Sequence, residues 1–159
     1  MYGADDRNAT VRALIQRVSH AEVAVAGERI AAIGRGILAL IAVEAGDGPG
    51  QGARLLERLL TYRIFPDGEG RMNLSLADVG GGLLLVPQFT LAADTRKGTR
   101  PGFSTAAPPE LARALFEGLA KEAASRHAPG VALGRFGADM QVSLTNDGPV
   151  TFLLETHGS

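Results

Sequence analysis

Residues 83–94 read LLLVPQFTLAAD, and this stretch decides both the fold and the candidate site. Its apolar start, Leu83–Val86, predicts a short buried strand. Pro87 lacks a backbone N–H, so it ends or bends that strand. Gln88 and Thr90 then place polar side chains on either side of a phenylalanine, and polar groups at the end of a rigid strand often form binding sites. The alternative is a strand end with two solvated polar residues.

Strand patterns occupy the first part of the chain, up to Val43. Polar and apolar residues alternate in the second half of Arg12–Ala26, and glycine turns separate it from Arg29–Ile33 and Ile37–Val43. The last of these segments is apolar throughout, which is typical of a central strand covered on both faces. With the two halves of Arg12–Ala26 counted separately, these are four strand-like segments, and so many in so short a stretch favour an antiparallel meander.

Helices are predicted on either side of the strand at Leu83. Ala53–Tyr62 has leucines at helical spacing, and a second helix is expected to begin at Pro108-Pro109. The side chains expected to face inward from the second helix are Leu111, Leu115, Phe116 and Leu119. The order of strands, helix, strands, helix and strands lacks regular βα alternation. It therefore indicates an α+β fold, an antiparallel sheet or open β-barrel with two packed helices.

Length and composition fit one such domain. The chain has 159 residues, of which 45% are hydrophobic, and we expect a single domain over residues 11–156 after a frayed or disordered extension at 1–10. No apolar run approaches the roughly 18 residues of a membrane span, and the polar N-terminus does not resemble a signal peptide. With no cysteine and a net charge of −1, the chain is expected to be cytoplasmic, without disulfides and without a global charge that would attract DNA.

The sequence TNDGPVT, residues 145–151, follows a cleanly alternating strand pattern at Asp139–Thr145. Asn-Asp-Gly is common turn chemistry, so a β-hairpin is predicted here, with the returning strand starting at Val150. Pro149 is unusual because it cannot donate to the sheet that should follow. A cis bond after Gly148 would hold the turn rigidly, whereas a trans proline would stop edge pairing, and the residues alone leave both open.

The histidines do not suggest a metal site. His20, His127 and His157 are not at metal-ligand spacing from one another, and each is expected on the surface, with His157 in a tail. Serine nucleophiles need a base, and the sequence has no G-x-S-x-G motif. We therefore predict no metal and no cofactor.

Two further segments have residue types that suit a nucleic acid. Phe136 and Met140 flank small residues that include Ala138, so they form either part of the core or a shallow slot for a flat base, as in adenosine. A polar loop at 95–105 either meets phosphates or is simply solvated. The cationic residues of this loop are Arg96, Lys97 and Arg100.

Two motifs, QFTLAAD at residues 88–94 and TNDGPVT at 145–151, resemble the signatures of the D-aminoacyl-tRNA deacylase family, often called DTD. Further similarity, in RALIQRV from Arg12 and GRFGADMQVSL from Gly134, extends the resemblance over about residues 11–155. Two long motifs in the right order make this resemblance specific. One position departs from it, since the family commonly has serine where this chain has Pro87.

The resemblance implies a DTD-like fold and a homodimer whose active sites lie at the subunit interface. The implied activity is hydrolysis of the ester that joins a D-amino acid to the terminal adenosine of tRNA, and of glycine mischarged onto tRNA(Ala). In this family the catalytic site is formed at Gln88, Phe89 and Thr90. The bond between Gly148 and Pro149 is implied to be cis and to enter the partner's pocket, where it excludes L-amino acids.

Elementary chemistry is consistent with these residue types. An aminoacyl ester is already activated, so it needs a positioned water and hydrogen-bond donors for the developing oxyanion rather than a strong nucleophile. Either the Thr90 hydroxyl or the 2′-OH of the RNA steers that water. Because of Pro87, the alternative function is a catalytically impaired tRNA-binding module of the same fold. A hydrolase of free D-amino-acid esters is a third hypothesis.

Overall fold

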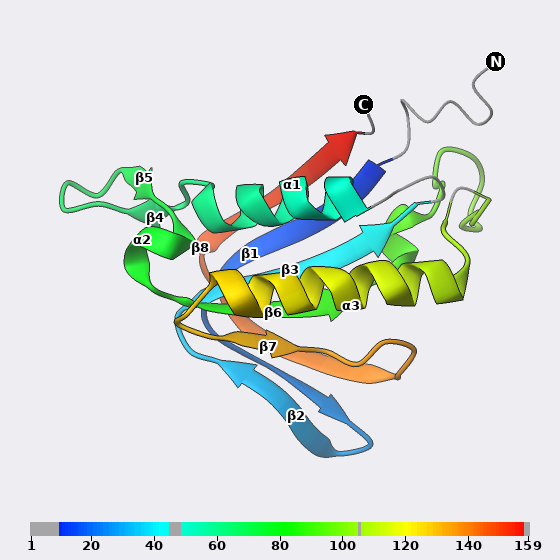
Figure 1. The fold of residues 1–159 in the computed structure, drawn as a ribbon, viewed down its shortest axis with the longest axis horizontal. Helices are drawn as coiled ribbons and strands as arrows, with labels where there is room; N and C mark the ends of the chain where they lie inside the picture. The colour runs from blue at the N-terminus through cyan, green and yellow to red at the C-terminus, as the bar shows by residue number, and fades with distance from the viewer. Residues whose placement is uncertain (1–9, 45–48, 105, 158–159) are drawn as a thin grey trace.

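The structure is a computed structural model that describes residues 10–44, 49–104 and 106–157 (Figure 1). Its elements are β1 Thr10–Val25, β2 Glu28–Ile33, β3 Gly36–Val43, α1 Pro49–Thr61, β4 Phe65–Pro66, β5 Met72–Leu74, α2 Leu76–Val79, β6 Gly82–Pro87, the 3₁₀ helix η2 Phe89–Ala92, α3 Pro109–Arg126, β7 Val131–Leu133 and β8 Met140–His157. The expected extension at residues 1–10 lies outside the described residues, except for Thr10, which begins β1.

β1 is the strand on which the sheet is built, because β2, β3 and β8 all pair with it antiparallel. β3 follows its first half and β2 its second half, while β8 runs along nearly all of it. At 16 residues, β1 is a single strand where separate segments were expected. By changing partners along its length, it curls the sheet toward an open barrel (Figure 1).

The sheet is mixed rather than antiparallel throughout. β6 pairs parallel with β3, and β7 pairs parallel with β6, which gives the order β2-β1-β3-β6-β7. Parallel neighbours require a crossover, and α1 and α3 lie in these two crossovers. The predicted α+β class with two packed helices is confirmed, whereas the prediction of antiparallel pairing is wrong for the two β6 pairs.

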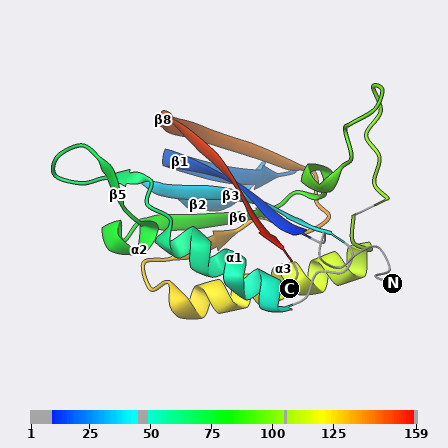
Figure 2. The ribbon, with the colours of Figure 1, turned by 90° about the horizontal axis from the view of Figure 1, so that it is seen from above.

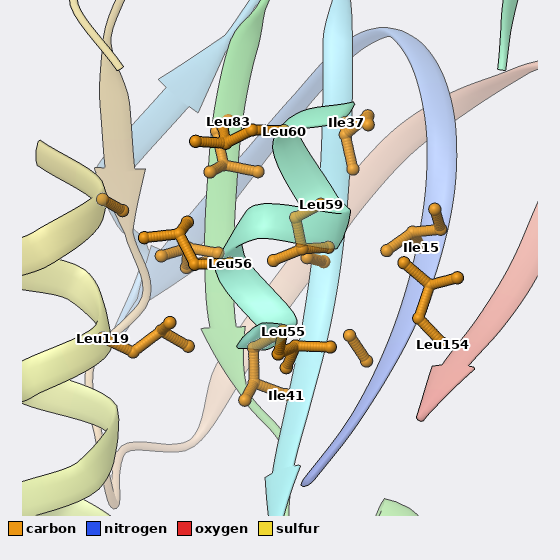
Figure 3. Packing of buried hydrophobic residues seen from close by; sticks show 14 of the residues in the cluster. Ile15, Ile37, Ile41, Leu55, Leu56, Leu59, Leu60, Leu83, Leu119 and Leu154 are labelled. Carbon is orange, nitrogen blue, oxygen red and sulfur yellow. The ribbon is translucent and has the colours of Figure 1, made fainter. Parts of the chain in front are cut away.

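The core lies between the sheet and the two long helices, which cover the same side of it (Figure 2). The helix predicted at Ala53–Tyr62 is α1, which begins earlier, at Pro49, and places its leucines in one core cluster with residues of β1, β3 and β6 (Figure 3). Helix α3 buries Ala112, Phe116 and Leu119, which lie at helical spacing. Leu111, expected inside, is 39% exposed because it precedes this buried face by one position. Burial of large side chains such as Phe116 and Leu119 contributes about 1.5–3 kcal/mol each.

The predicted hairpin at residues 145–151 is wrong, because β8 continues through it as one strand. Thr145 lies opposite His20 and Thr151 lies opposite Gln16, so both halves of β8 pair with β1 in the same direction. The residues between form a bulge that Asn146 closes, with its side chain accepting from the Val150 N–H at 2.7 Å. A continuous pairing edge on β1 therefore overrides local turn chemistry, and His157, expected in a tail, is the last residue of β8.

Candidate active site

The candidate site begins where β6 leaves the sheet. Leu83–Val86 are buried between β3 and β7, as predicted, and Pro87 is the last residue that pairs with β3. The N–H of Gln88 still donates to the Ile41 carbonyl at 2.7 Å, and η2 begins at the next residue. The buried strand thus holds this polar segment on a rigid support.

Gln88 and Thr90 interact directly. The Gln88 Nε2 group donates a hydrogen bond to the Thr90 hydroxyl oxygen. A hydroxyl that accepts in this way keeps its own hydrogen free to donate. The N–H groups of Phe89 and Thr90 precede the first hydrogen bond of η2, from the Leu91 N–H to the Gln88 carbonyl, so helix geometry gives them no acceptor within η2. The segment therefore has backbone and hydroxyl donors that are not used within η2.

A pocket of about 500 Å³ opens beside this segment and brings together five of the predicted site residues. These are Gln88, Phe89, Phe136, Ala138 and Met140. Thr90 is exposed and lies at the edge, bonded to Gln88. Sequence reasoning missed the α3 wall, formed by Ala112 and Phe116, since apolar residues at helical spacing indicate only a core face. It also missed Asp139, whose neighbours along the chain were singled out.

The aromatic wall of this pocket is held from outside. The Arg113 guanidinium lies over the Phe136 ring, 5.0 Å from its centroid. A cation stacked on a ring stabilises its orientation by about 0.5–1 kcal/mol at an exposed site. Phe89 is 63% exposed and contacts the Phe103 ring, with 5.4 Å between centroids. The Phe136 ring is thus held by a cation, whereas most of the Phe89 side chain is exposed to solvent.

Gly148 and Pro149 lie in the β8 bulge, exposed, and the bond between them is cis. Arg17, on β1, holds this bulge: its Nε donates to the Asp147 carbonyl at 2.9 Å and its Nη1 donates to the Ile64 carbonyl at 2.7 Å. The Arg17 side chain is only 12% exposed and also lies 3.7 Å from the Asp147 carboxylate. Arg17 therefore links the bulge to β1 and to the segment at Ile64.

The bulge does not reach the pocket of its own chain. Asn146 lies opposite Val18, which lies opposite Gly36, which lies opposite Gly82 at the start of β6. Gln88 follows the other end of β6. The bulge at Asn146 is therefore separated from Gln88 by three strand spacings, about 14 Å, across the sheet and by about 20 Å along the strands. The structure thus does not bring Gly148 and Pro149 together with Gln88 in one protomer.

The described residues contain no group of His, Cys, Asp and Glu side chains that could hold a metal ion. All three histidines were expected on the surface, but His127 is buried. It follows the last residue of α3, and its Nε2 lies 2.6 Å from the Gly81 carbonyl oxygen. Within the same part of the chain, no helix is long and apolar enough to cross a membrane. The candidate site in one protomer is therefore the mostly apolar pocket beside the end of β6 and η2.

Such a fold and pocket define a small α+β protein with a mostly apolar pocket at the end of a buried strand. The family profile described as D-Tyr-tRNA(Tyr) deacylase matches residues 14–155. Among curated relatives, the D-aminoacyl-tRNA deacylase of Methylococcus capsulatus is 66% identical over 142 residues, covering 89% of this chain and 92% of that protein. The protein of the same name from Thioalkalivibrio sulfidiphilus is 67% identical over 143 residues, covering 90% and 95%. The chain therefore belongs to the D-Tyr-tRNA(Tyr) deacylase family, and it is a hydrolase acting on aminoacyl-tRNA.

Two solved structures have a similar fold. A structure titled c-Myc DNA Unwinding Element Binding Protein has a TM-score of 0.87 at 37% identity, covering 91% of this chain and 98% of that one. A second structure, titled as a probable eukaryotic D-amino acid tRNA deacylase, has a TM-score of 0.84 and covers 92% and 100%. At 18% identity, the second comparison shows the shared fold alone.

Proposed function

We propose that this protein hydrolyses the ester between a D-amino acid, or glycine mischarged onto tRNA(Ala), and the terminal adenosine of tRNA. We further propose that it acts as a homodimer, in which Gly148 and Pro149 of each protomer enter the pocket of the other. The observation that carries the proposal is the convergence of Gln88, Phe89 and the residues Phe136–Met140 on one pocket. The ester carbonyl would then lie beside the donors of η2.

The chemistry needs only positioning and charge stabilisation. Water attacks the ester carbonyl carbon, the new C–O bond forms, and the bond to the ribose oxygen breaks as that oxygen takes a proton. The N–H groups of Phe89 and Thr90 donate to the oxyanion that develops, an effect worth about 2.7–4 kcal/mol per donor in other acyl-transfer sites. The water is steered either by the Thr90 hydroxyl, whose hydrogen is left free by Gln88, or by the 2′-OH of the ribose.

The pocket suits the terminal adenosine. Its volume of about 500 Å³ is in the range of small-molecule sites, and its walls are mostly apolar. The Phe136 ring offers a face on which a base can stack, and Arg113 holds that ring in place. Ala138 is small enough to let the base approach, and the Met140 thioether closes the slot.

Chirality is enforced by exclusion across the dimer. Because the bulge is far from the pocket of its own chain, only a second protomer can bring Gly148 and Pro149 to the substrate. In a two-fold dimer the same contact forms twice, giving two equivalent sites. Exposed backbone carbonyls at the bulge would bind the α-ammonium group and leave no room for an L side chain, whereas glycine, with no side chain, passes.

The test compares D-Tyr-tRNA, L-Tyr-tRNA and Gly-tRNA(Ala) as substrates for the purified protein. We expect release of D-Tyr and glycine, and no release of L-Tyr above the uncatalysed rate. Equal release of D-Tyr and L-Tyr would contradict the steric account, and a monomer mass on size-exclusion chromatography would contradict the shared site.

The impaired tRNA-binding module remains as a second candidate because of Pro87, whose ring lines the pocket and whose nitrogen cannot donate. That candidate predicts binding of D-Tyr-tRNA without release of D-Tyr. It also predicts that Pro87→Ser restores release. We expect the parent protein to be active and Pro87→Ser to change its rate by less than about tenfold, because the donors invoked above lie at the following residues.

A further inference from the structure

The loop at residues 94–104 is the feature that the proposed function leaves unused. It rises from the end of η2 and projects away from the sheet and the helices (Figure 2). Two backbone hydrogen bonds between Asp94 and Gly102, at 2.7 and 3.0 Å, close its base. At this base, the Phe103 ring rests on Phe89, a residue of the pocket. The loop is thus held next to the candidate active site.

The loop carries a cationic surplus in a chain whose net charge is −1. Arg96 is paired, with its Nε and Nη2 each 2.9 Å from an oxygen of Asp94. This pairing holds the pKa of Asp94 well below its usual range, so the pair stays ionised and compensated. Lys97 and Arg100 are exposed and have no ion pair among the residues that the structure describes. Their charges are therefore free to meet a ligand.

These cations surround a hollow of about 550 Å³, to which the Ser104 side chain adds a hydroxyl. Basic side chains around a polar hollow are typical of phosphate binding. The position of the hollow indicates which molecule would supply the phosphate. It lies just beyond the pocket proposed for the terminal adenosine, and the strand that enters that pocket carries one phosphate per nucleotide.

We propose that Lys97 and Arg100 bind the phosphate backbone of the tRNA 3′ strand, immediately upstream of the terminal adenosine. This inference rests on the proposed function, since it needs tRNA in the pocket. Arg96, fixed by Asp94, shapes the loop, and Ser104 donates to a phosphate oxygen. The contact is independent of sequence, so it gives affinity for any tRNA while the pocket and the partner's bulge select the amino acid.

The experiment measures binding of uncharged tRNA by fluorescence anisotropy at several salt concentrations. The loop variant is Lys97→Gln with Arg100→Gln. The control variant is Arg71→Gln with Lys121→Gln, which removes the same charge from hairpin β4–β5 and from the last part of α3, both far from the loop (Figure 1). We expect the loop variant to lose about tenfold in affinity, because each exposed ion pair changes an equilibrium constant by up to about fivefold.

The salt dependence gives a second readout. The slope of log Kd against log salt should fall by about 1.4–1.8 in the loop variant, as expected for two lost phosphate contacts, and stay at the parent value in the control. Equal losses in both variants would show general attraction only and would overturn the proposal. An unchanged loop variant would overturn it as well. Unfolding curves of both variants confirm that the fold is kept.

A third readout separates this inference from the proposed function. D-Tyr esterified to free adenosine has the same ester and base but no phosphodiester. The preference of the enzyme for D-Tyr-tRNA over this ester, in kcat/KM, should fall about tenfold in the loop variant and not in the control. If the parent hydrolyses neither substrate, the proposed function fails. If the parent hydrolyses both and the preference does not change in the loop variant, the phosphate contact fails.

Discussion

Substitution of Gly148 by alanine tests whether the β8 bulge has a role beyond joining two halves of a strand. Gly148 has a φ of +146°, a backbone conformation that residues with a Cβ rarely adopt. A Cβ placed there would lie 2.6 Å from Val150 Cγ2 and 2.9 Å from the Val150 backbone nitrogen. That nitrogen donates to the Asn146 side chain, so any shift that relieves the clash also disturbs the hydrogen bond that closes the bulge.

The cost follows from these contacts. A residue held in so unfavourable a backbone region costs about 1–3 kcal/mol. For a domain of this size, each kcal/mol lowers Tm by about 2–4 °C, so we expect Tm to fall by about 2–12 °C. Activity should fall further, because a displacement of about 1 Å in a positioning element costs up to about 100-fold in rate.

The assay pairs thermal unfolding with deacylation of D-Tyr-tRNA at a temperature where the variant remains folded. Gly68→Ala is the matched control, because a Cβ at Gly68 meets no atom within 4 Å. We expect parental Tm and activity in Gly68→Ala, and at least a tenfold loss of activity in Gly148→Ala. Parental turnover in a folded Gly148→Ala variant would refute the idea that this bulge shapes the substrate site.

Three further predictions concern the site and its support. Thr90→Ala should lower the deacylation rate by about tenfold or more, and equal rates for Thr90→Ala and the parent would contradict the role of that hydroxyl. Ser75→Ala removes the buried N-cap of α2, so it should cost about 1 kcal/mol of stability and leave the rate per folded molecule unchanged. Arg17→Ala should lower stability by about 1–3 kcal/mol and also reduce deacylation, because the Asp147 and Ile64 carbonyls lose their donor. Arg17→Lys should recover only part of the stability and part of the activity. Hydrogen bonds from Ser75 hold the pKa of Asp78 below its usual range, so their contribution to stability is present above the pKa of a free carboxyl and is lost as the pH falls through the lowered pKa. Asp78→Asn should therefore show a smaller fall in Tm between pH 5 and pH 2, and an identical fall would be evidence against this coupling.

The part of the fold nearest to Pro87 was predictable from the sequence, because its signals are local. An apolar run followed by proline gives a strand that ends, and the structure places Gln88 at that end. The grouping of Phe136, Ala138 and Met140 was also visible as a spacing of aromatic, small and thioether residues. That they share a pocket with Gln88 depends on β7 and α3, and periodicity does not determine which strands become neighbours.

The errors share one physical cause, which is pairing between distant segments. Asn146-Asp147-Gly148 has the composition of a tight turn, yet β1 offers partners to both sides of it, and the ladder continues. Likewise, Ile37–Val43 fits a parallel or an antiparallel neighbour equally well, and only the crossover through α1 decides. Arg17 is 130 positions from Asp147, so no local pattern indicates that it anchors the bulge.

The most direct measurement mixes two impaired variants, Thr90→Ala and Gly148→Ala, by co-expression. In a heterodimer, one site combines both defects, while the other combines the intact η2 of one protomer with the intact bulge of its partner. With random pairing, about a quarter of all sites should be intact, so deacylation of D-Tyr-tRNA should reach at least about a quarter of the parental rate, above the tenth or less expected of each homodimer. At equal total protein, activity no greater than the average of the two homodimers would contradict a site shared between protomers.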